Sequence, residues 1–355
     1  MNEQTITLKD IARRANTSTT TVYRVINNKE GVGDAMRKKI LAISEEMGYS
    51  VNFAASALSK KSSPTLVLVF PKEDQYGRYF TTPMFMGYQK CKKECERFNV
   101  RFLEYFFDIE EESILAVLNE LYNNPELTID GLIIYPLRSN RVNNMLSKFE
   151  GKGIPLIFIE KEFPDINSLS CVTTDEYQAG RIAGELLSNF IHFSGRVLIC
   201  DADVTSLEED MVSRANSTGC SDELSQGRPD LQWETIHESY VHNRLQQLLI
   251  EKFQRYDDIV GIYCTTARNT VAAMQVLNQV MQEHPIVFIG SEVFDESVAL
   301  LKQGTITCLI NKNPYELGYQ ALRQLFNHVV LGEPVKKTFI INPRIVLRSN
   351  VSSFI

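Results

Sequence analysis

The sequence lacks the features that mark membrane-spanning and exported proteins. Its longest apolar runs, such as Leu66–Phe70 and Ile154–Ile159, are far shorter than the roughly 20 residues that a helix needs to cross a bilayer. The first residues show neither the basic start nor the apolar stretch of a signal peptide. We therefore expect a cytoplasmic protein that has no membrane partner.

Cysteine and histidine are too scattered for a disulfide framework or a metal site. The chain has seven cysteines and five histidines, and an odd number of dispersed thiols is typical of a reducing compartment. Cys91 and Cys95 lie four residues apart on an expected helix, but no second ligand pair follows them. Packing of that helix face explains the pair, and we expect no metal and no cofactor.

Motifs of the common catalytic sites are also missing. The sequence shows no nucleophile elbow, no glycine-rich phosphate loop and no histidine-centred triad. Glu160 and Glu292 could be interpreted as the acid and base of a glycosidase. Ligand binding is the alternative interpretation of these two residues, and because the other catalytic motifs are missing we expect no enzyme activity.

Charge is divided unevenly along the 355 residues, although the net charge of −7 taken whole argues against nucleic acid. Residues 1–61 hold ten Lys and Arg against six Asp and Glu, which gives +4. Residues 62–355 hold 27 against 38, which gives −11. A basic head on an acidic body indicates that only the head meets a polyanion.

The head begins with two predicted helices around a tight turn. The first is capped by Thr7, and its apolar stripe is Leu8, Ile11, Ala12 and Ala15. Asn16 favours a left-handed turn, and Ser18 can cap a second helix that runs from Thr19 to about Asn27. The outer face of the second helix is expected to carry polar side chains that can reach bases or phosphates: Thr19, Thr20, Tyr23, Arg24 and Asn27.

A third helix is predicted to begin near Asp34 and to end at Gly48. Its buried face would consist of Met36, Ile40, Ile43 and Met47. The basic run Arg37-Lys38-Lys39 is explained equally well as a solvated face and as a phosphate contact.

In order and spacing, residues 7–61 resemble the head of the lactose and purine repressor family (LacI/GalR). The matching motifs are Thr7-Leu8-x-Asp10-Ile11-Ala12, Ser18-x-x-Thr21-Val22-x-Arg24-Val25-Ile26-Asn27 and Gly48-Tyr49-x-x-Asn52. The resemblance implies a recognition helix in the major groove of operator DNA. The DNA-contacting residues that it implies in the head are Thr7, Ser18, Thr19, Thr20, Thr21, Tyr23, Arg24 and Asn27.

The following segment resembles the family's hinge, which folds when two subunits meet on DNA. The resemblance implies contacts from Asn52 and Ala55, and a minor-groove wedge from Leu58. Packing of Leu58 against the body is the alternative. Val51, Phe53 and Ser56 depart from the family's usual residues, which puts the usual operator sequence in doubt but not DNA binding.

The body from Thr65 onward alternates short apolar runs with helical stretches, which predicts parallel α/β sheets. The predicted strands are Leu66–Phe70, Val100–Phe106, Gly131–Tyr135, Pro155–Ile159, Val197–Cys200, Val260–Cys264 and Ile286–Ile289. The predicted helices are Phe85–Phe98, Glu111–Tyr122, Arg141–Phe149, Ala179–Phe190, Val241–Phe253, Thr270–Met281 and Glu296–Leu301. Ligands of such sheets bind at the carboxyl ends of the strands.

The body is similar to the two-lobed periplasmic sugar-binding fold that this family carries as its sensor. The likeness lies in residues 131–160, Thr174-Asp175-x4-Gly180, Ile289-Gly290-Ser291-Glu292 and residues 305–318. It implies a helix-turn-helix domain at 1–50, a hinge and linker at 51–64, and an effector-binding and dimerisation domain at 65–355. One lobe is expected at about 65–171 with 309–336, and the other at about 172–308 with 337–355.

The same resemblance implies an effector cleft between the lobes. Its candidate contacts are Phe80, Tyr135, Glu160, Lys161, Arg214, Thr266, Glu292 and Lys312. Carboxylates and an Arg can hold hydroxyls by strong hydrogen bonds, and aromatic faces stack on sugar rings. Each residue could instead be a surface charge or a loop residue.

We therefore expect a homodimeric, or higher, regulator of double-stranded operator DNA controlled by a small sugar-like effector. Lys161, Arg214 and Lys312 leave a sugar acid or sugar phosphate open as the effector, and a nucleobase is a further alternative. A transport binding protein is the rival class, but it would need an export signal and no DNA-reading head.

Overall fold

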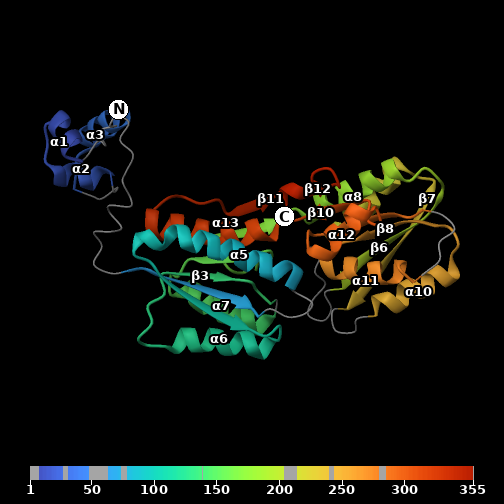
Figure 1. The fold of residues 1–355 in the computed structure, drawn as a ribbon. Coiled ribbons are helices and arrows are strands. Elements are labelled where there is room, and N and C mark those ends of the chain that lie inside the picture. Colours follow the sequence, from blue (N-terminus) through green and yellow to red (C-terminus); the bar gives the residue numbers. More distant parts are fainter. Residues whose placement is uncertain are drawn as a thin grey trace. The chain divides into compact units, whose positions relative to one another are not determined.

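The computed structural model describes residues 8–26, 31–47, 63–72, 78–137, 139–203, 214–239, 244–279 and 285–354. The chain forms two compact units, Met1–Lys61 and Ser62–Ile355 (Figure 1). Each unit has its own core, so each is described by itself.

The first unit is a bundle of three short helices, α1 (Leu8–Ala15), α2 (Thr19–Ile26) and α3 (Asp34–Glu46). Asn16 adopts the left-handed conformation, with φ of 54°, which makes the predicted turn between α1 and α2. The apolar stripes of the three helices meet in one core of Ile11, Ala12, Ala15, Val22, Val25 and Ile40. The apolar periodicity of the sequence therefore predicted this core correctly.

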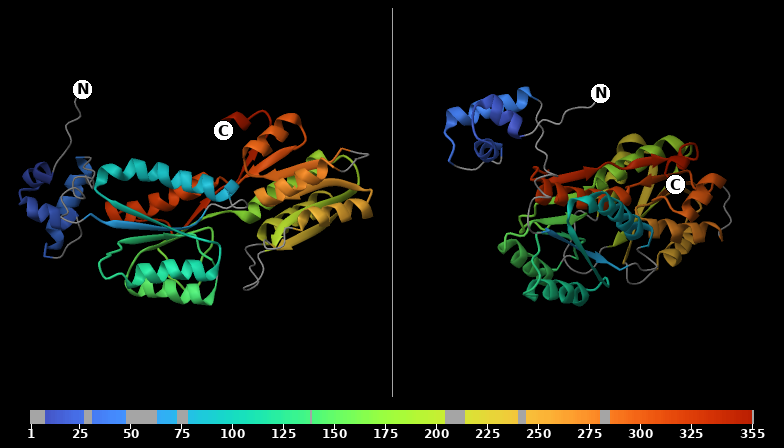
Figure 2. Two further views of the ribbon diagram at one scale, coloured as in Figure 1. Left: turned by 60° about the horizontal axis from the view of Figure 1, so that its bottom comes forward. Right: turned by 60° about the vertical axis from the view of Figure 1, so that its left-hand side comes forward.

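The second unit contains two six-stranded sheets, each packed against helices (Figures 1 and 2). We call the first sheet with its helices lobe 1, and the second sheet with its helices lobe 2. The lobe 1 sheet has the order β11-β5-β4-β3-β1-β2 and is parallel throughout. Its strands are β1 (Thr65–Pro71), β2 (Arg101–Phe107), β3 (Gly131–Ile134), β4 (Leu156–Ile159), β5 (Ser170–Thr174) and β11 (Thr338–Ile341).

The lobe 2 sheet has the order β12-β10-β9-β8-β6-β7. Only the pair of β10 and β12 is antiparallel in this sheet as described. The strands are β6 (Gly195–Asp203), β7 (Leu231–Ser239), β8 (Ile259–Cys264), β9 (Val287–Ser291), β10 (Cys308–Asn311) and β12 (Arg344–Val346).

Helices cover both faces of each sheet, which explains why most strands are apolar on both sides. In lobe 1, α5 (Arg78–Cys95) and α13 (Pro314–Phe326) lie side by side on one face, and α6 (Glu111–Asn123) and α7 (Asn140–Gly151) on the other (Figure 1). In lobe 2, α8 (Glu176–Phe190) pairs with α9 (Ala215–Gly227). The opposite face carries α10 (Leu245–Arg255), α11 (Ala267–Leu277) and α12 (Asp295–Gln303).

Each lobe contains one helix pair that packs backbone against backbone through glycine. A Cβ on Gly318 of α13 would lie 1.8 Å from the carbonyl oxygen of Met84 in α5. A Cβ on Gly180 of α8 would lie 1.8 Å from the carbonyl oxygen of Asn216 in α9. The two lobes therefore use the same device, in which a missing side chain allows close helix contact.

The chain crosses between the lobes three times, and these crossovers correct the predicted lobe limits. They follow Thr174, Asn311 and Ile341, because β5 and β11 belong to the lobe 1 sheet and β10 and β12 to the lobe 2 sheet. The assignment of 172–174 and 337–341 to lobe 2, and of 309–311 to lobe 1, was wrong. Thr338 pairs with Cys171 and Leu309 with Gly290, and such long-range pairing leaves no mark in the local sequence.

Several predicted elements differ from the observed ones at their ends or were missed. The helix predicted at Phe85–Phe98 begins at Arg78 and ends at Cys95. The strands β5, β7, β10, β11 and β12 and the helices α9 and α13 were not predicted. The sequence of α9, ANSTGCSDELSQG, is polar and rich in small residues, so it shows no clear apolar stripe.

Candidate functional site

Two glutamates stand at equivalent places in the two lobes, each directly after a central strand. Glu160 follows β4 of lobe 1 and Glu292 follows β9 of lobe 2. Both adopt left-handed backbone conformations, with φ of 71° and 68°. The other non-glycine residues with positive φ in the described chain are all asparagines, which tolerate this conformation. Glutamate does not, and strain of this kind concentrates at functional sites.

An ion pair joins two of the crossovers beside these glutamates. Lys312, which follows β10, donates from Nζ to Oε1 of Glu176 at 3.1 Å and to the carbonyl oxygen of Thr265 at 3.4 Å. Only 7 % of Lys312 is exposed. Burial alone would lower the pKa of Lys312, but Glu176, Glu292 and Glu160 together raise it. Lys312 is therefore positively charged at neutral pH.

A chain of hydrogen bonds fixes the other side of Glu176. Asn216 of α9 donates from Nδ2 to Oε2 of Glu176 at 2.7 Å, and Tyr263 of β8 donates to Oδ1 of Asn216 at 2.6 Å. Both carboxylate oxygens of Glu176 are thus occupied, one by Lys312 and one by Asn216. The ion pair of Glu176 and Lys312 therefore leaves neither carboxylate oxygen of Glu176 without a hydrogen bond.

Glu292, by contrast, has few hydrogen bonds to the described residues. It is 1 % exposed, and its Oε1 accepts only a long bond of 3.4 Å from the backbone NH of Lys312. Within the described part of the chain, its buried Oε2 has no hydrogen-bond partner. Burial raises the pKa of Glu292 to about 8, against the lowering effect of Lys312. A buried, unpaired carboxyl oxygen is costly and implies that a further donor belongs there.

Glu160 lies in the same electrostatic environment but is half-buried. Burial raises the pKa of Glu160 to about 7, Lys312 and Lys161 lower it, and Glu176 raises it. The predicted residues Glu160, Lys161, Glu292 and Lys312 are therefore coupled in one place. We call these four residues with Glu176 the charged cluster.

The two predicted aromatic residues, Phe80 and Tyr135, differ in what their rings contact. Phe80 of α5 lies with its ring centre 5.5 Å from Nζ of Lys312, close enough for a cation–π contact. Tyr135 directly follows β3 and contacts Phe70 edge-on, with ring centres 6.0 Å apart. Phe80 therefore contacts a residue of the charged cluster. The ring of Tyr135 contacts Phe70, another residue of lobe 1.

Two predicted contacts are placed differently. Thr266 is the N-cap of α11, where its Oγ1 accepts from the NH of Asn269 at 3.1 Å. Its neighbour Thr265 instead contacts the cluster, through the carbonyl bonded by Lys312. Arg214 is exposed and immediately precedes α9. Its position before Asn216 puts it near the network, but the described hydrogen bonds to the cluster come from Asn216.

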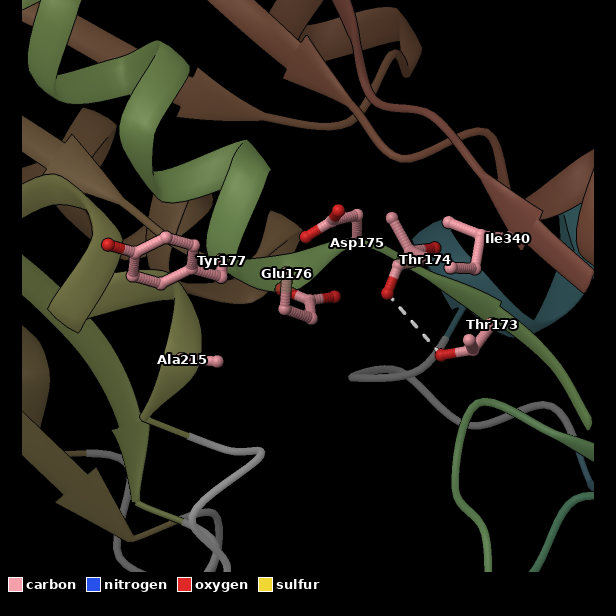
Figure 3. A pocket seen from close by; sticks show the side chains of 7 residues that line it. All are labelled: Thr173, Thr174, Asp175, Glu176, Tyr177, Ala215 and Ile340. Carbon is pink, nitrogen blue, oxygen red and sulfur yellow. Dashed lines mark hydrogen bonds between the residues drawn. The ribbon is translucent and has the colours of Figure 1, made fainter. Parts of the chain in front are cut away.

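An open pocket lies along the crossover from β5 to α8 (Figure 3). It has a volume of about 380 Å³ and is lined by Thr173, Thr174, Asp175, Glu176, Tyr177, Ala215 and Ile340. Its size is within the usual range for small-molecule sites. Glu176 connects this pocket to Lys312, so the charged cluster borders a space that a small ligand can enter.

Glu176, Asn216 and Thr265 were missed by the sequence analysis. Glu176 follows the Thr174-Asp175 motif that had been noticed, and a charged residue at the first position of a crossover helix was the available signal. Asn216 and Thr265 carried no signal, since they meet the cluster only through folding.

In the first unit, the side chains predicted to read DNA point outward where they are described. Ser18 caps α2 by accepting from the NH of Thr21 at 3.0 Å, while Thr19, Thr20 and Arg24 are exposed and Val22 is buried. Thr7, Asn27, Asn52, Ala55 and Leu58, and the side chain of Tyr23, lie outside the described residues. The helix that carries the reading residues thus has a polar outer face.

No helix in the described ranges combines the length and apolar character that crossing a membrane requires.

Comparison with known proteins matches both parts of the chain. Residues 7–52 match the model of bacterial regulatory proteins of the lacI family, and residues 73–334 match the periplasmic binding protein domain. A relative is the "Probable HTH-type transcriptional repressor ExuR" of Bacillus subtilis (strain 168), 26% identical over 175 residues, which are 48% of each chain. The chain thus spans about half the length of the curated relatives it matches.

Solved structures share the fold. GanP, a glucose-galactose binding protein from Geobacillus stearothermophilus, has a TM-score of 0.68 at 21% identity, covering 82% of this chain and 99% of that one. The transcriptional regulator CelR in complex with cellobiose has a TM-score of 0.64 at 17% identity, covering 96% of this chain and 98% of that one. The chain belongs to the periplasmic binding protein domain family, and it carries a lacI-family regulatory segment at its N-terminus.

Proposed function

We propose that this protein is a transcription regulator that binds double-stranded operator DNA and whose DNA affinity is controlled by a small polyhydroxylated effector. The observation that carries the proposal is the combination, on one chain, of a helix-turn-helix unit with an outward polar helix and a buried charged cluster between two lobes. As a regulator of DNA it would act in the cytoplasm, without catalysing a reaction.

The DNA-binding part of the proposal rests on α2. Its exposed residues Thr19, Thr20 and Arg24 are short hydroxyl and guanidinium donors that suit base edges and phosphates. We assign Ser18 and Thr21 to the cap that orients the start of this helix. Thr7, Tyr23 and Asn27 are assigned further contacts, and Asn52, Ala55 and Leu58 the hinge contacts, on the family pattern.

The effector-binding part rests on the charged cluster. Glu292 and Glu160 offer carboxyl oxygens at the carboxyl ends of β9 and β4, the usual ligand position of parallel sheets. Phe80 offers an apolar face beside them. We assign Lys161, Arg214, Thr266 and Tyr135 to the rim of the site, and Lys312 to holding Glu176 in place.

Pairing of two such chains is part of the proposal, because two heads are needed to read both halves of a symmetric DNA site. Effector binding would alter the arrangement of the lobes and so the DNA affinity. Thermodynamic linkage then requires DNA to change effector affinity by the same factor.

Selection of duplexes from a random DNA pool by the purified full-length protein tests this function. We expect enrichment of a two-fold symmetric sequence, with binding that weakens steeply with salt. Arg24→Ala and Thr20→Val should each lose about 1–3 kcal/mol of binding to the selected site. Lys93→Ala, an exposed cation on α5 of the body, is the matched control and should bind normally. Absence of any enriched sequence would refute the proposal.

The rival class is a solute-binding protein that serves transport, since such proteins share the fold. The outward polar face of α2 in the first unit favours the regulator, because a transport protein has no use for it. Unchanged solute binding together with no affinity for duplex DNA at low salt would favour the rival.

A further inference from the structure

The charged cluster contains more carboxyls than ammonium groups. Glu160, Glu176 and Glu292 supply three carboxyls, whereas Lys312 and Lys161 supply two ammonium groups. The excess is one negative charge if all of them ionise. Since Glu292 and Lys312 are almost fully buried, ionisation of all three carboxyls would require a further positive group, which water cannot replace cheaply.

The two ammonium groups are not available to an anionic ligand in equal measure. Lys312 is committed on three sides, to Oε1 of Glu176, to the carbonyl of Thr265 and to the ring of Phe80. Lys161 is half-buried, and its charge acts on Glu160. Inside the rim that carries Arg214, an anion would therefore meet committed cations and two neighbouring carboxyls.

Glu292 shows where a further positive group is needed. No described residue forms a hydrogen bond with its buried Oε2, and the described charged groups that act on it are Lys312 after β10, Glu176 on α8 and Glu160 after β4. Both neighbouring acids disfavour its ionised form. A hydroxyl could form the hydrogen bond to Oε2, but only a cation would also stabilise the ionised form of this carboxyl.

We propose that the effector is an amino sugar or a closely similar polyhydroxylated amine whose protonated nitrogen contacts Oε2 of Glu292. The sugar hydroxyls would use Glu160, and the apolar ring face would lie against Phe80. This inference rests on the proposed effector site and selects its ligand class, against the sugar acids and sugar phosphates that the basic residues of the sequence had left open.

The raised pKa of Glu292 is consistent with this assignment. The carboxyl is held largely protonated at neutral pH in the empty site, because burial and the neighbouring acids penalise its charge. An ammonium group placed against Oε2 would favour the ionised form, so the site would lose a proton when the amine binds.

The test is calorimetric titration of the purified full-length protein with matched sets of sugars. Each set holds the amine, the neutral parent and the acid of one skeleton: glucosamine, glucose and glucuronate; galactosamine, galactose and galacturonate; mannosamine, mannose and mannuronate. We expect one amine to bind at least about tenfold more tightly than its neutral parent and its uronate. A uronate or a neutral sugar that binds as tightly as its amine, or failure of all three amines, would overturn the inference.

The variant Glu292→Gln separates charge recognition from structure. The amide keeps the shape of the carboxyl and removes its charge, so the preference for amine over neutral parent should fall by about tenfold. Glu120→Gln, an exposed residue of α6, is the control and should keep the preference. An unchanged preference in Glu292→Gln would overturn the inference. Failure of the inference would leave duplex selection by the head unaffected, whereas failure of the proposed regulator would abolish that selection.

Discussion

The hydroxyl of Tyr79, at the start of α5 in lobe 1, donates a hydrogen bond of 3.0 Å to Oε1 of Glu296 in the first turn of α12 in lobe 2. The ring of Tyr79 also packs on Phe294, with ring centres 4.2 Å apart. This contact joins the two lobes in addition to the three crossovers of the chain. It therefore stabilises the arrangement of the lobes seen here relative to any other.

Tyr79→Phe should weaken that inter-lobe contact while keeping the ring packing. Loss of one hydrogen bond of this kind costs about 0.5–1.5 kcal/mol, which corresponds to roughly 2- to 13-fold in the equilibrium between lobe arrangements. We expect effector affinity, measured by calorimetry, to change by a factor in this range. Identical affinity in Tyr79→Phe and the unmodified protein would show that the contact does not influence the lobes.

Breaking the ion pair of Lys312 with Glu176 should destabilise the body strongly. Lys312→Met leaves the Glu176 carboxylate partly buried without its cation, and removing one partner of a buried pair costs about 3–5 kcal/mol. Urea unfolding measures this loss. The double variant Lys312→Met with Glu176→Gln should recover part of the stability, because no unpaired charge of the former pair is left. If the double variant lost as much free energy of unfolding as the two single variants added together, the result would contradict the pairing.

Stability of the body should depend on pH through Glu292. Its pKa rises from an ordinary value of 4.5 to about 8 in the folded protein, so the folded state retains a proton that the unfolded chain releases above pH 4.5. Folding therefore loses stability as pH rises from about 4.5 to about 8, at up to about 1.4 kcal/mol per pH unit from this group. Thermal unfolding at a series of pH values should show this slope, and Glu292→Gln should reduce it. Equal slopes would argue against the shifted carboxyl.

Gly318→Ala should disrupt the packing of α5 on α13. Its Cβ would meet the carbonyl oxygen of Met84 at 1.8 Å, which forces the two helix backbones apart. Overpacking of this kind costs about 1–3 kcal/mol, and more where backbone must move. Gly151→Ala is the control, since its Cβ would meet nothing within 4 Å and its backbone is helical. Similar melting temperatures for the two variants would contradict the close approach.

Local patterns in the sequence correctly predicted the three helices of the head and most of the central strands. The cap at Ser18, the turn at Asn16 and the alternation of buried and exposed positions in α2 depend on neighbours only a few residues away. The same is true of the apolar strands β1, β3, β4 and β8, which are buried on both faces. These elements could be predicted because short-range periodicity determines which face is buried.

Local sequence patterns were not sufficient to predict the charged cluster. Resemblance to a family pointed to Glu160, Glu292 and Lys312, but their chemical states depend on groups from distant segments. Glu176 meets Lys312 across 136 positions of sequence, and Asn216 reaches it from another helix. The sequence had left Lys312 open as a ligand for anions, and only its three contacts in the fold show that it is committed to the protein.

The amino-acid sequence by itself determined the class of the protein: a basic helical head, an acidic α/β body, and acidic residues after two apolar strands. Only the tertiary structure decided which sheet takes β10, β11 and β12, and which buried carboxyl oxygen has no hydrogen-bond partner among the described residues. The physical reason is that helix and strand formation follow side chains close in sequence, whereas strand order, burial and pKa arise from groups that meet only when the chain has folded.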